Sequence, residues 1–592
     1  MQSIKFQDGF EVNTGKKSNY TGLKILLVLA LLVVPLGIYF YFRFLNQNQK
    51  ISLDSNANKL VPDIKGIETC RDPLNSKLVK SLYWWDESYP YYKEIYISKN
   101  SDFNTNKGIQ FIFDHQSLVK ETKSRQDAKD IKIIKRKGNE FSTVPFNIAN
   151  ANSNTTTIKF IDVGYEGDVN YLLYYGNLST NAENPNEITL NNENSYNIWL
   201  SNEIVYPLHI KLDRIWALKG YENGSISITV DIDPNLKINI PAVHYEILGT
   251  DIVSVILPIN GIYQTNVNFT DLAPGTYQIQ ATLSDDCYTI KSTKKTFYVS
   301  FPLFVVWSMD WEGTSTREEF LNSIDALANK YEIPITQLFN PRIYITSSIS
   351  QSNKDLMTNW VKKRKNEKGD EVGLHIHMWK DMVSAASIQP KNYPQWGDRN
   401  DGYDVLFSAY DYNESVKIIK WAINELKKHG FEDIITFRAG GWMLDSENIK
   451  ALESNKIKID TSARTKYIWG SKLVHGLWDI QITTKPYMPS KVDINKTNAD
   501  HFNVWEFPNN GGDSDYYDYE EMKARFDKNY TDKFMNEPQV VTFLSHPHSF
   551  NIDYPKMDKL FGYISQFNYK YDKGPIVFIT LKDVLKFWEK YE

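Results

Sequence analysis

The second half of the chain repeats one pattern, in which a short apolar run is followed by an amphipathic, helix-like stretch. The run "LFVVWSMD" (303–310) precedes "STREEFLNSIDALANKY", and the alternation continues through "EVGLHIHMW" and "QVVTFLSH" to "KDVLKFWEKY". Strands that alternate with helices form a parallel sheet with crossover helices. About seven repeats suit a closed barrel better than an open sheet. We therefore predict an α/β fold, a distorted (β/α) barrel, over residues 301–592.

Charged and imidazole side chains stand at the carboxyl ends of five of these predicted strands. They are Asp310 with Glu312, His375 with His377, Arg438, Asp460, and His546 with His548. The carboxyl ends of the strands are where α/β barrels build their active sites. The sequence therefore predicts that these residues share one rim.

The spacing of two within these pairs suggests a metal site. Side chains alternate along a strand, so Asp310 and Glu312 can both face the barrel mouth, as can His375 and His377. One carboxylate and two imidazoles make a three-ligand site with an open position, which suits catalytic zinc and other divalent metals. The second carboxylate is then free to act as a base. Each motif alone also has an ordinary structural explanation, so the hypothesis depends on their common position.

Five short motifs resemble, in order, those of the polysaccharide deacetylases, which remove N-acetyl or O-acetyl groups from chitin oligomers, peptidoglycan and related glycans. They are "SMDWEG", "EVGLHIHMW", "FRAGGW", "IDTS" and "TFLSHPH", and the resemblance covers about residues 302–590. The commonest family pattern has two adjacent aspartates and a histidine pair at i and i+4. This chain has Asp310-Trp311-Glu312 and His375 with His377, similar to the D-x-E and H-x-H-x-W branches of the family.

The resemblance implies a role for each motif residue. It implies three ligands for a divalent metal, for which zinc is the favoured ion: Glu312, His375 and His377. Asp310 would be the general base toward water, and His546 would donate a proton to the departing amine. Arg438 would orient Asp310, and Asp460 would hold His546 in the right tautomer.

Aromatic residues near the motifs are candidates for stacking on sugar rings, with packing inside the rim as an equal alternative. The predicted substrate-binding residues are Trp379, Trp442 and Trp396. Residues 380–413 form a segment that is too long for an ordinary βα connection. We expect it to shape the substrate site or to act as a lid.

The first half of the chain predicts β domains. Residues 76–215 contain short β-type runs between polar turns, without a strong helical period, which indicates a β-sandwich. Residues 216–300 are predicted to form an immunoglobulin-like β domain, because "DLAPGTYQIQATLSD" resembles the late hairpin of such a domain.

One apolar segment near the N-terminus predicts a membrane anchor. Residues 25–42, "ILLVLALLVVPLGIYFYF", contain no charge and would form a helix roughly 27 Å long, about the thickness of a bilayer's hydrocarbon core. We predict a cytoplasmic tail (1–24), a transmembrane helix (25–44) and a polar linker (45–75). Lysines before the span favour a single-pass protein of the cell membrane with a cytoplasmic N-terminus. A cleaved signal peptide is the alternative, but no small-residue cleavage site follows.

Together these features predict a membrane-anchored, extracytoplasmic, metal-dependent deacetylase of a cell-envelope or extracellular polysaccharide. The net charge of -5 gives no reason to expect nucleic acid as a partner, and no protein partner is indicated. A catalytically degenerate barrel in a surface glycan-binding or adhesion protein is the alternative. Hydrolysis of a non-glycan amide or of an O-acetyl ester is a third possibility.

Overall fold

A computed structural model describes residues 84–591, apart from 87, 98–107, 139, 162–168, 179, 181–197, 207, 233–241, 270 and 285–288. The predicted tail (1–24), transmembrane helix (25–44) and linker (45–75) lie outside these residues. Within the described part of the chain, no helix has the length and apolarity needed to cross a membrane.

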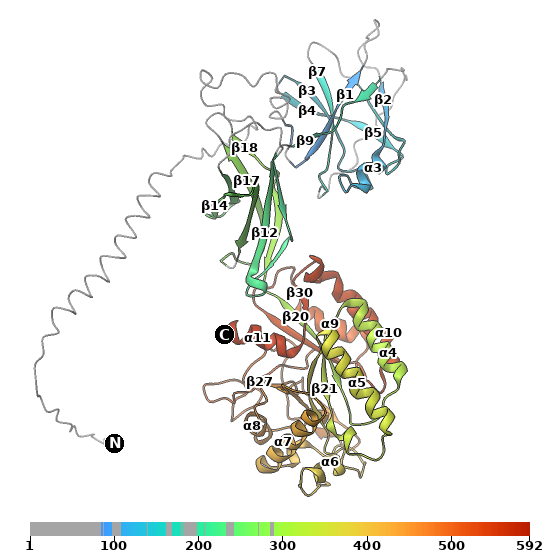
Figure 1. Cartoon of the computed structure of the whole chain (residues 1–592), viewed down its shortest axis with the longest axis vertical. Helices are drawn as coiled ribbons and strands as arrows, with labels where there is room; N and C mark the ends of the chain where they lie inside the picture. The colour runs from blue at the N-terminus through green and yellow to red at the C-terminus, as the bar shows by residue number, and fades with distance from the viewer. Residues whose placement is uncertain are drawn as a thin grey trace, which may run out of the picture. The chain divides into compact units, whose positions relative to one another are not determined.

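A parallel sheet organises the C-terminal half, which is described without a gap from residue 291 to 591 (Figure 1). Its strands are β20 (Leu303–Asp310), β21 (Ile335–Phe339), β22 (Glu371–Ile376), β23 (Thr436–Ala439), β24 (Ile459–Asp460), β27 (Trp505–Glu506), β28 (Gly512–Asp513), β29 (Gln539–Ser545) and β30 (Ile576–Phe578). Their order is β27-β24-β23-β22-β21-β20-β29-β28, with β30 also on β20. Every pairing is parallel.

Chain connectivity forces this sheet to curve. Eight flat strands would put the edge strands β27 and β28 about 34 Å apart, at about 4.8 Å per strand. The six steps from Glu506 to Gly512 span at most about 22 Å. The connecting residues also bond to the strands next to both edges: Phe507 N donates to Asp460 O on β24 (2.8 Å), and Gly511 N donates to Thr542 O on β29 (3.0 Å). The α/β architecture thus closes as a distorted barrel.

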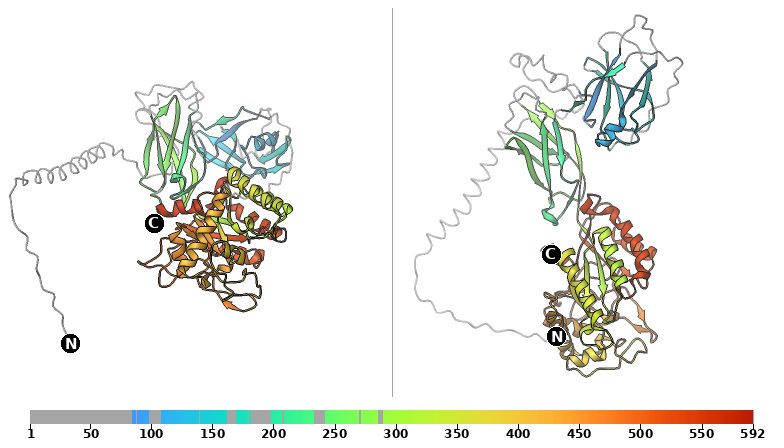
Figure 2. Two further views of the ribbon diagram at one scale, coloured as in Figure 1. Left: turned by 60° about the horizontal axis from the view of Figure 1, so that its bottom comes forward. Right: turned by 45° about the vertical axis from the view of Figure 1, so that its right-hand side comes forward.

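Helices lie along the outside of these strands (Figures 1 and 2). They are α4 (Glu318–Tyr331), α5 (Gln351–Lys368), α6 (Lys380–Ala385), α7 (Tyr412–Lys428), α8 (Ser446–Ser454), α9 (Tyr519–Asn529), α10 (Phe550–Ile564) and α11 (Leu581–Tyr591). The helices cover the outer face of the strands, and the strands' inner faces pack against one another inside the barrel. This explains why β20, β22 and β29 contain only buried residues. The sequence does not predict α10, because Pro555 lies inside it.

Two all-β units precede the barrel. The first contains β1 (Tyr91–Ile97), β2 (Gly108–Phe113), β3 (Lys132–Lys137), β4 (Glu140–Val144), β5 (Phe146–Ala149), β6 (Thr156–Ile161), β7 (Val169–Tyr175), β8 (Ile198–Leu200) and β9 (Ile204–Val205), with one short helix, α3 (His115–Lys120). Its sheets run β4-β3-β7-β1-β8, with β9 on β1, and β2-β6-β5. Ile133 from one sheet and Phe160 from the other share a buried cluster, as expected of a β-sandwich.

The second β unit contains β10 (Leu208–Leu212), β11 (Trp216–Leu218), β12 (Ser225–Ile232), β13 (Val243–Ile247), β14 (Val253–Ile256), β15 (Pro258–Ile259), β16 (Ile262–Asn268), β17 (Gly275–Ser284), β18 (Thr289–Lys291) and β19 (Lys295–Ser300). Its sheets run β10-β12-β16-β15 and β11-β19-β17-β13-β14, with β18 on β17. The predicted boundary at 215/216 is wrong for β10, because Leu208–Leu212 pairs with β12 of the second unit. Sequence periodicity identifies a strand but not its partner.

A buried ion pair fixes the start of β22, the strand that carries His375. Arg364 of α5 is 2% exposed and donates to both carboxylate oxygens of Asp370 (2.7 and 2.8 Å). Asp370 also accepts from Ile335 N (3.0 Å), so the pair joins α5 to β21 and β22. A charge buried this deeply is stable only while its partner is present.

We therefore expect Arg364→Met to lower the free energy of unfolding by about 3–5 kcal/mol, because Asp370 would stay buried without a counter-charge. Denaturant unfolding followed by tryptophan fluorescence would measure the loss. The control is Arg317→Met, which removes an exposed arginine whose ion pair with Glu319 is also exposed and should change stability by less than about 0.5 kcal/mol. Equal effects of the two substitutions would contradict this interpretation.

Candidate active site

The carboxyl ends of parallel strands meet at one edge of a sheet, and here they bring three potential metal ligands together. One ligating atom each from Glu312, His375 and His377 lies within 4.8 Å of the other two, and all three residues are buried. Glu312 Oε2 is 2.6 Å from His377 Nε2, and Oε1 is 3.4 Å from His375 Nε2. The structure thus gathers the carboxylate and imidazoles that the sequence predicts as metal ligands.

Backbone carbonyls set the orientation of both imidazoles. His375 Nδ1 is 3.0 Å from Arg438 O, and His377 Nδ1 is 3.1 Å from Tyr403 O. A carbonyl only accepts, so each Nδ1 carries a proton and donates it, and each ring turns its Nε2 toward Glu312. This is the usual support of histidines that ligate metals.

A buried nitrogen without a hydrogen-bond partner is a second observation that fits a divalent metal at these three residues. His375 Nε2 is buried and has no hydrogen-bond partner among the described residues. A buried polar atom without a partner is costly, and a native structure normally explains it. Two imidazole nitrogens and a carboxylate oxygen, all pointing into one space, are ligands that zinc and related ions prefer.

The ionisation of these groups supports an anionic carboxylate between the rings. Burial acts to raise the pKa of Glu312, but His377 and His375 outweigh it and hold this pKa well below its ordinary value. Burial acts to lower the pKa of His375, yet the charges of Asp310 and Glu312 raise it overall. The pocket therefore favours positive charge beside Glu312, as a cation site requires.

The second carboxylate of the motif has a different partner. Arg438 is fully buried, and its Nη1 donates to Asp310 Oδ1 and Ser308 Oγ, both at 2.9 Å. Its remaining donors are held by Thr461, through the backbone carbonyl (2.9 Å) and the hydroxyl (3.0 Å). Asp310 is therefore fixed by a guanidinium and Glu312 by imidazoles, so two acids only two residues apart occupy distinct environments.

A third imidazole also lies close to Glu312. His546, directly after β29, has Nε2 3.2 Å from Glu312 Oε1 and Nδ1 3.1 Å from Asp515 Oδ2. Asp513 Oδ1 is 3.7 Å from the same Nδ1. Burial acts to lower the pKa of His546, but Asp513, Asp515 and Glu312 raise it well above its ordinary value. The ring is thus held in the protonated form expected of a general acid.

The predicted partner of His546 is wrong. Asp460 accepts from Ser462 Oγ (2.7 Å) and pairs in register with Glu506 on β27, and no contact between Asp460 and His546 occurs among the described residues. Burial raises the pKa of Asp460 to about 6. The carboxylates beside His546 are Asp513 and Asp515, which sequence reasoning missed because "GGDSDYY" follows a long irregular segment and its strand has only two residues.

The three tryptophans that are candidates for stacking on sugar rings are packed inside the rim, as the alternative interpretation of these residues predicts. Trp379, Trp442 and Trp396 are 4%, 4% and 5% exposed. Trp379 Nε1 donates to Glu312 O (3.0 Å), and the Trp396 ring lies edge-on to His377 with centroids 5.8 Å apart. Trp379 and Trp396 thus pack against proposed ligands, and all three rings leave little surface for a sugar.

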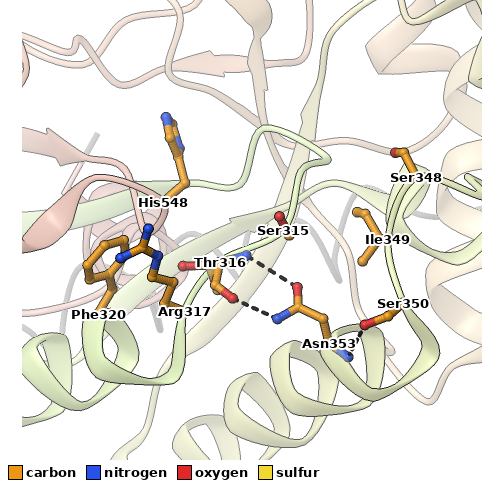
Figure 3. Close-up of a pocket in the computed structure, with 9 residues that line it drawn as sticks. All are labelled: Ser315, Thr316, Arg317, Phe320, Ser348, Ile349, Ser350, Asn353 and His548. Carbon is orange, nitrogen blue, oxygen red and sulfur yellow. Dashed lines mark hydrogen bonds between the residues drawn. The ribbon is translucent and has the colours of Figure 1, made fainter.

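A cavity of about 450 Å³ opens next to this centre (Figure 3). Its walls carry hydroxyl, amide and guanidinium groups from Ser315, Arg317, Ser348, Ser350 and Asn353, and His548. Asn353 exchanges two hydrogen bonds with the Thr316 backbone (2.7 and 3.3 Å), which fixes the wall. Since the His548 ring centroid is 5.6 Å from that of His546, the cavity adjoins the candidate acid.

Comparison with known proteins gives similarity to solved structures alone. No family model matches the chain, and no curated protein matches it. Peptidoglycan deacetylase PdaC from Bacillus subtilis is 12% identical, over 49% of this chain and 93% of that one, with a TM-score of 0.25. The family 4 carbohydrate esterase from Streptomyces lividans is 7% identical, over 45% and 90%, with a TM-score of 0.23.

A family 4 acetyl xylan esterase from Clostridium thermocellum, solved with a cobalt ion, is 11% identical over 48% of this chain and 90% of that one, with a TM-score of 0.23. These likenesses cover about half of the chain. The roles of individual residues rest on the geometry of the site.

Gly440, just after β23, makes room for His377. A Cβ at this position would lie 2.6 Å from His377 Cγ and Nδ1. We predict that Gly440→Ala displaces the imidazole and weakens binding of a divalent ion at least about tenfold, since ligand orientation governs metal affinity. Titration of the metal-free protein with Zn²⁺ would measure this. Gly275→Ala, whose Cβ would make only an ordinary 3.7 Å contact, is the control, and equal affinities would refute the prediction.

Proposed function

We propose that this protein is a divalent-metal-dependent hydrolase that removes acetyl groups, foremost N-acetyl groups, from a polysaccharide. The observation that carries the proposal is the buried cluster of Glu312, His375 and His377. Asp310 and His546 flank this cluster, each with its own charged partner. The polysaccharide substrate follows from the resemblance of the five sequence motifs, and zinc is the ion that the ligand set favours.

The two flanking groups suit the two proton transfers of amide hydrolysis. When bound to this cluster, a divalent ion would polarise the acetyl carbonyl and make a water molecule more acidic. Asp310 would accept a proton from the attacking water. Arg438 holds the Asp310 carboxylate in place through the 2.9 Å contact to Oδ1.

His546 would then donate a proton to the departing nitrogen. An amine leaves as a neutral molecule only if it is protonated, so an acid opposite the base is needed. The carboxylates of Asp513 and Asp515 lie on the Nδ1 side of the ring and orient its Nε2 toward Glu312. The base and the acid thus come from the adjacent strands β20 and β29, and His546 contacts the Glu312 carboxylate directly.

The cavity beside His548 supports a substrate larger than an acetyl group. Its lining of hydroxyl, amide and guanidinium groups, with Phe320 and Ile349 as apolar surface, offers both kinds of contact that a sugar ring makes. We infer that a neighbouring part of the glycan occupies it. Nothing in this arrangement requires the scissile bond to be an amide, so the same site could also hydrolyse an O-acetyl ester.

The degenerate-barrel alternative is harder to reconcile with the site. Asp310, Glu312, Arg438 and His546 are all less than a tenth exposed. Buried charges are costly unless they are paired or ligate a metal, and they are lost readily once function no longer maintains them. Stoichiometric metal would separate the two hypotheses, because a decayed site should not retain it.

We further propose that the chain is anchored in the cell membrane by residues 25–44, with the hydrolase outside the cytoplasm. The support is the uncharged run "ILLVLALLVVPLGIYFYF" and the lysines before it. Fractionation of cells that produce the full chain, followed by protease treatment of intact cells, would test this orientation.

Asp310→Asn tests the assignment of the base. The amide keeps the shape of the side chain but cannot accept the proton, so we expect acetate release from N-acetylated chitin oligomers or peptidoglycan to fall about 10²–10⁴-fold. Binding of Zn²⁺ should change little, because the three proposed ligands remain. Asp500→Asn, at an exposed site, serves as the control. If Asp310→Asn keeps full turnover, Asp310 is not the general base.

Asp515→Asn tests the acid through the pH profile. His546 faces Glu312, Asp513, Asp515 and His548, and the acids raise its pKa, so it stays protonated to higher pH than an ordinary histidine. Turnover should fall as pH rises through this pKa. Loss of the Asp515 charge lowers the pKa of His546, so the alkaline limb of the kcat profile should shift to lower pH. An unshifted limb would contradict the assignment.

A further inference from the structure

One residue of the long segment after β22 reaches both kinds of proposed metal ligand. Tyr403 lies between α6 and α7, in a segment for which the sequence predicts only a role toward substrate. Its hydroxyl donates to Glu312 Oε2 (2.9 Å), and its backbone carbonyl accepts from His377 Nδ1 (3.1 Å). A single residue thus holds the carboxylate with its side chain and an imidazole with its main chain.

The Tyr403 ring makes a third contact. It stacks face to face on the His377 imidazole, with centroids 3.9 Å apart and planes inclined by 3°. Arg399 lies over the same tyrosine ring at 4.4 Å, and the Trp379 ring meets it edge-on at 5.0 Å. The phenol is therefore held from several directions while it touches the ligands.

The backbone around Tyr403 is seated against the end of β22. Gly402 has φ +93°, and a Cβ there would lie 2.3 Å from Met378 O and 2.8 Å from Lys380 N. Lys380 N donates to Asp401 O (2.8 Å), and Tyr403 N donates to Asp401 Oδ1 (3.1 Å). Only glycine allows so close an approach of two backbone segments, so the position of Tyr403 is built into the fold.

We propose that Tyr403 is a positioning residue of the metal centre, which fixes the Glu312 carboxylate and the His377 ring for one divalent ion. This inference rests on the proposed function. With a phenolic O–H on Oε2, Glu312 offers an ion mainly one oxygen, which leaves a coordination position open. The long segment after β22 therefore completes the metal centre as well as bordering the substrate site.

The test is Tyr403→Phe in the full chain, made metal-free with a chelator and titrated with Zn²⁺ against a chromophoric competitor. We expect the Kd to rise about 10–100-fold, as is usual when a group that holds a ligand is removed. With Co²⁺ in place of Zn²⁺, the visible absorption bands should change in position or intensity, because the coordination of Glu312 changes. A merely structural role would leave these bands unchanged.

Tyr410→Phe is the matched control, because it removes another tyrosine hydroxyl from the same segment that accepts from Lys391 N (2.9 Å) and touches no proposed ligand. Its Kd and Co²⁺ spectrum should equal those of the wild type. If Tyr403→Phe does not fold, Arg399→Met, which removes the cation over the Tyr403 ring and its ion pair with Asp401 but leaves the Tyr403 hydroxyl in place, should still raise the Kd by a smaller factor.

The outcomes separate this inference from the proposed function. If the wild type binds neither Zn²⁺ nor Co²⁺, the proposed metal centre itself is wrong. If the wild type binds an ion and Tyr403→Phe has the same Kd and the same spectrum, only the role of Tyr403 is overturned. A lower melting temperature of the variant with unchanged metal binding would also overturn it, since Tyr403 would then serve stability alone.

Discussion

Two carboxylates that are two residues apart and both buried are the constraint on which the site depends. Asp310 and Glu312 share one end of the barrel, and neither is more than 6% exposed. Buried like charges repel, so each needs its own positive partner. Arg438 supplies one for Asp310. For Glu312 the chain supplies two imidazoles whose Nδ1 atoms donate to backbone carbonyls, which turns both Nε2 atoms toward the carboxylate.

The register of the parallel sheet explains how distant segments provide these partners. His375 and Arg438 are cross-strand neighbours on β22 and β23, which places the Arg438 carbonyl beside the His375 ring and its guanidinium within reach of β20. Crossover connections then bring β29 next to β20, so that His546 lies within 3.2 Å of Glu312 Oε1. The proposed base and acid come from neighbouring strands, β20 and β29, while the two histidine ligands come from β22 on the other side of β20.

Much of this arrangement can be predicted from sequence, and the exceptions have physical causes. Long apolar runs predict β20, β22 and β29, and the side-chain period of two places Glu312 and the His375–His377 pair on one rim. Residues held by short or irregular segments are not predicted. Asp513 follows a connection without periodicity, and Tyr403 lies in a long loop. The sequence pattern therefore does not predict that Asp513 lies beside His546 or that Tyr403 contacts Glu312 and His377. The assignment of Asp460 to His546 failed because motif order does not determine side-chain contacts.

The central claim is that one divalent ion lies between Glu312, His375 and His377. The most direct measurement is anomalous diffraction at the zinc absorption edge from crystals of the zinc-loaded protein. The account predicts one strong peak bounded by the Glu312 carboxylate and the Nε2 atoms of both histidines. A peak confined to the other cluster of potential ligands, formed by Asp513, Asp515 and His546, or the absence of any peak near Glu312, would contradict it.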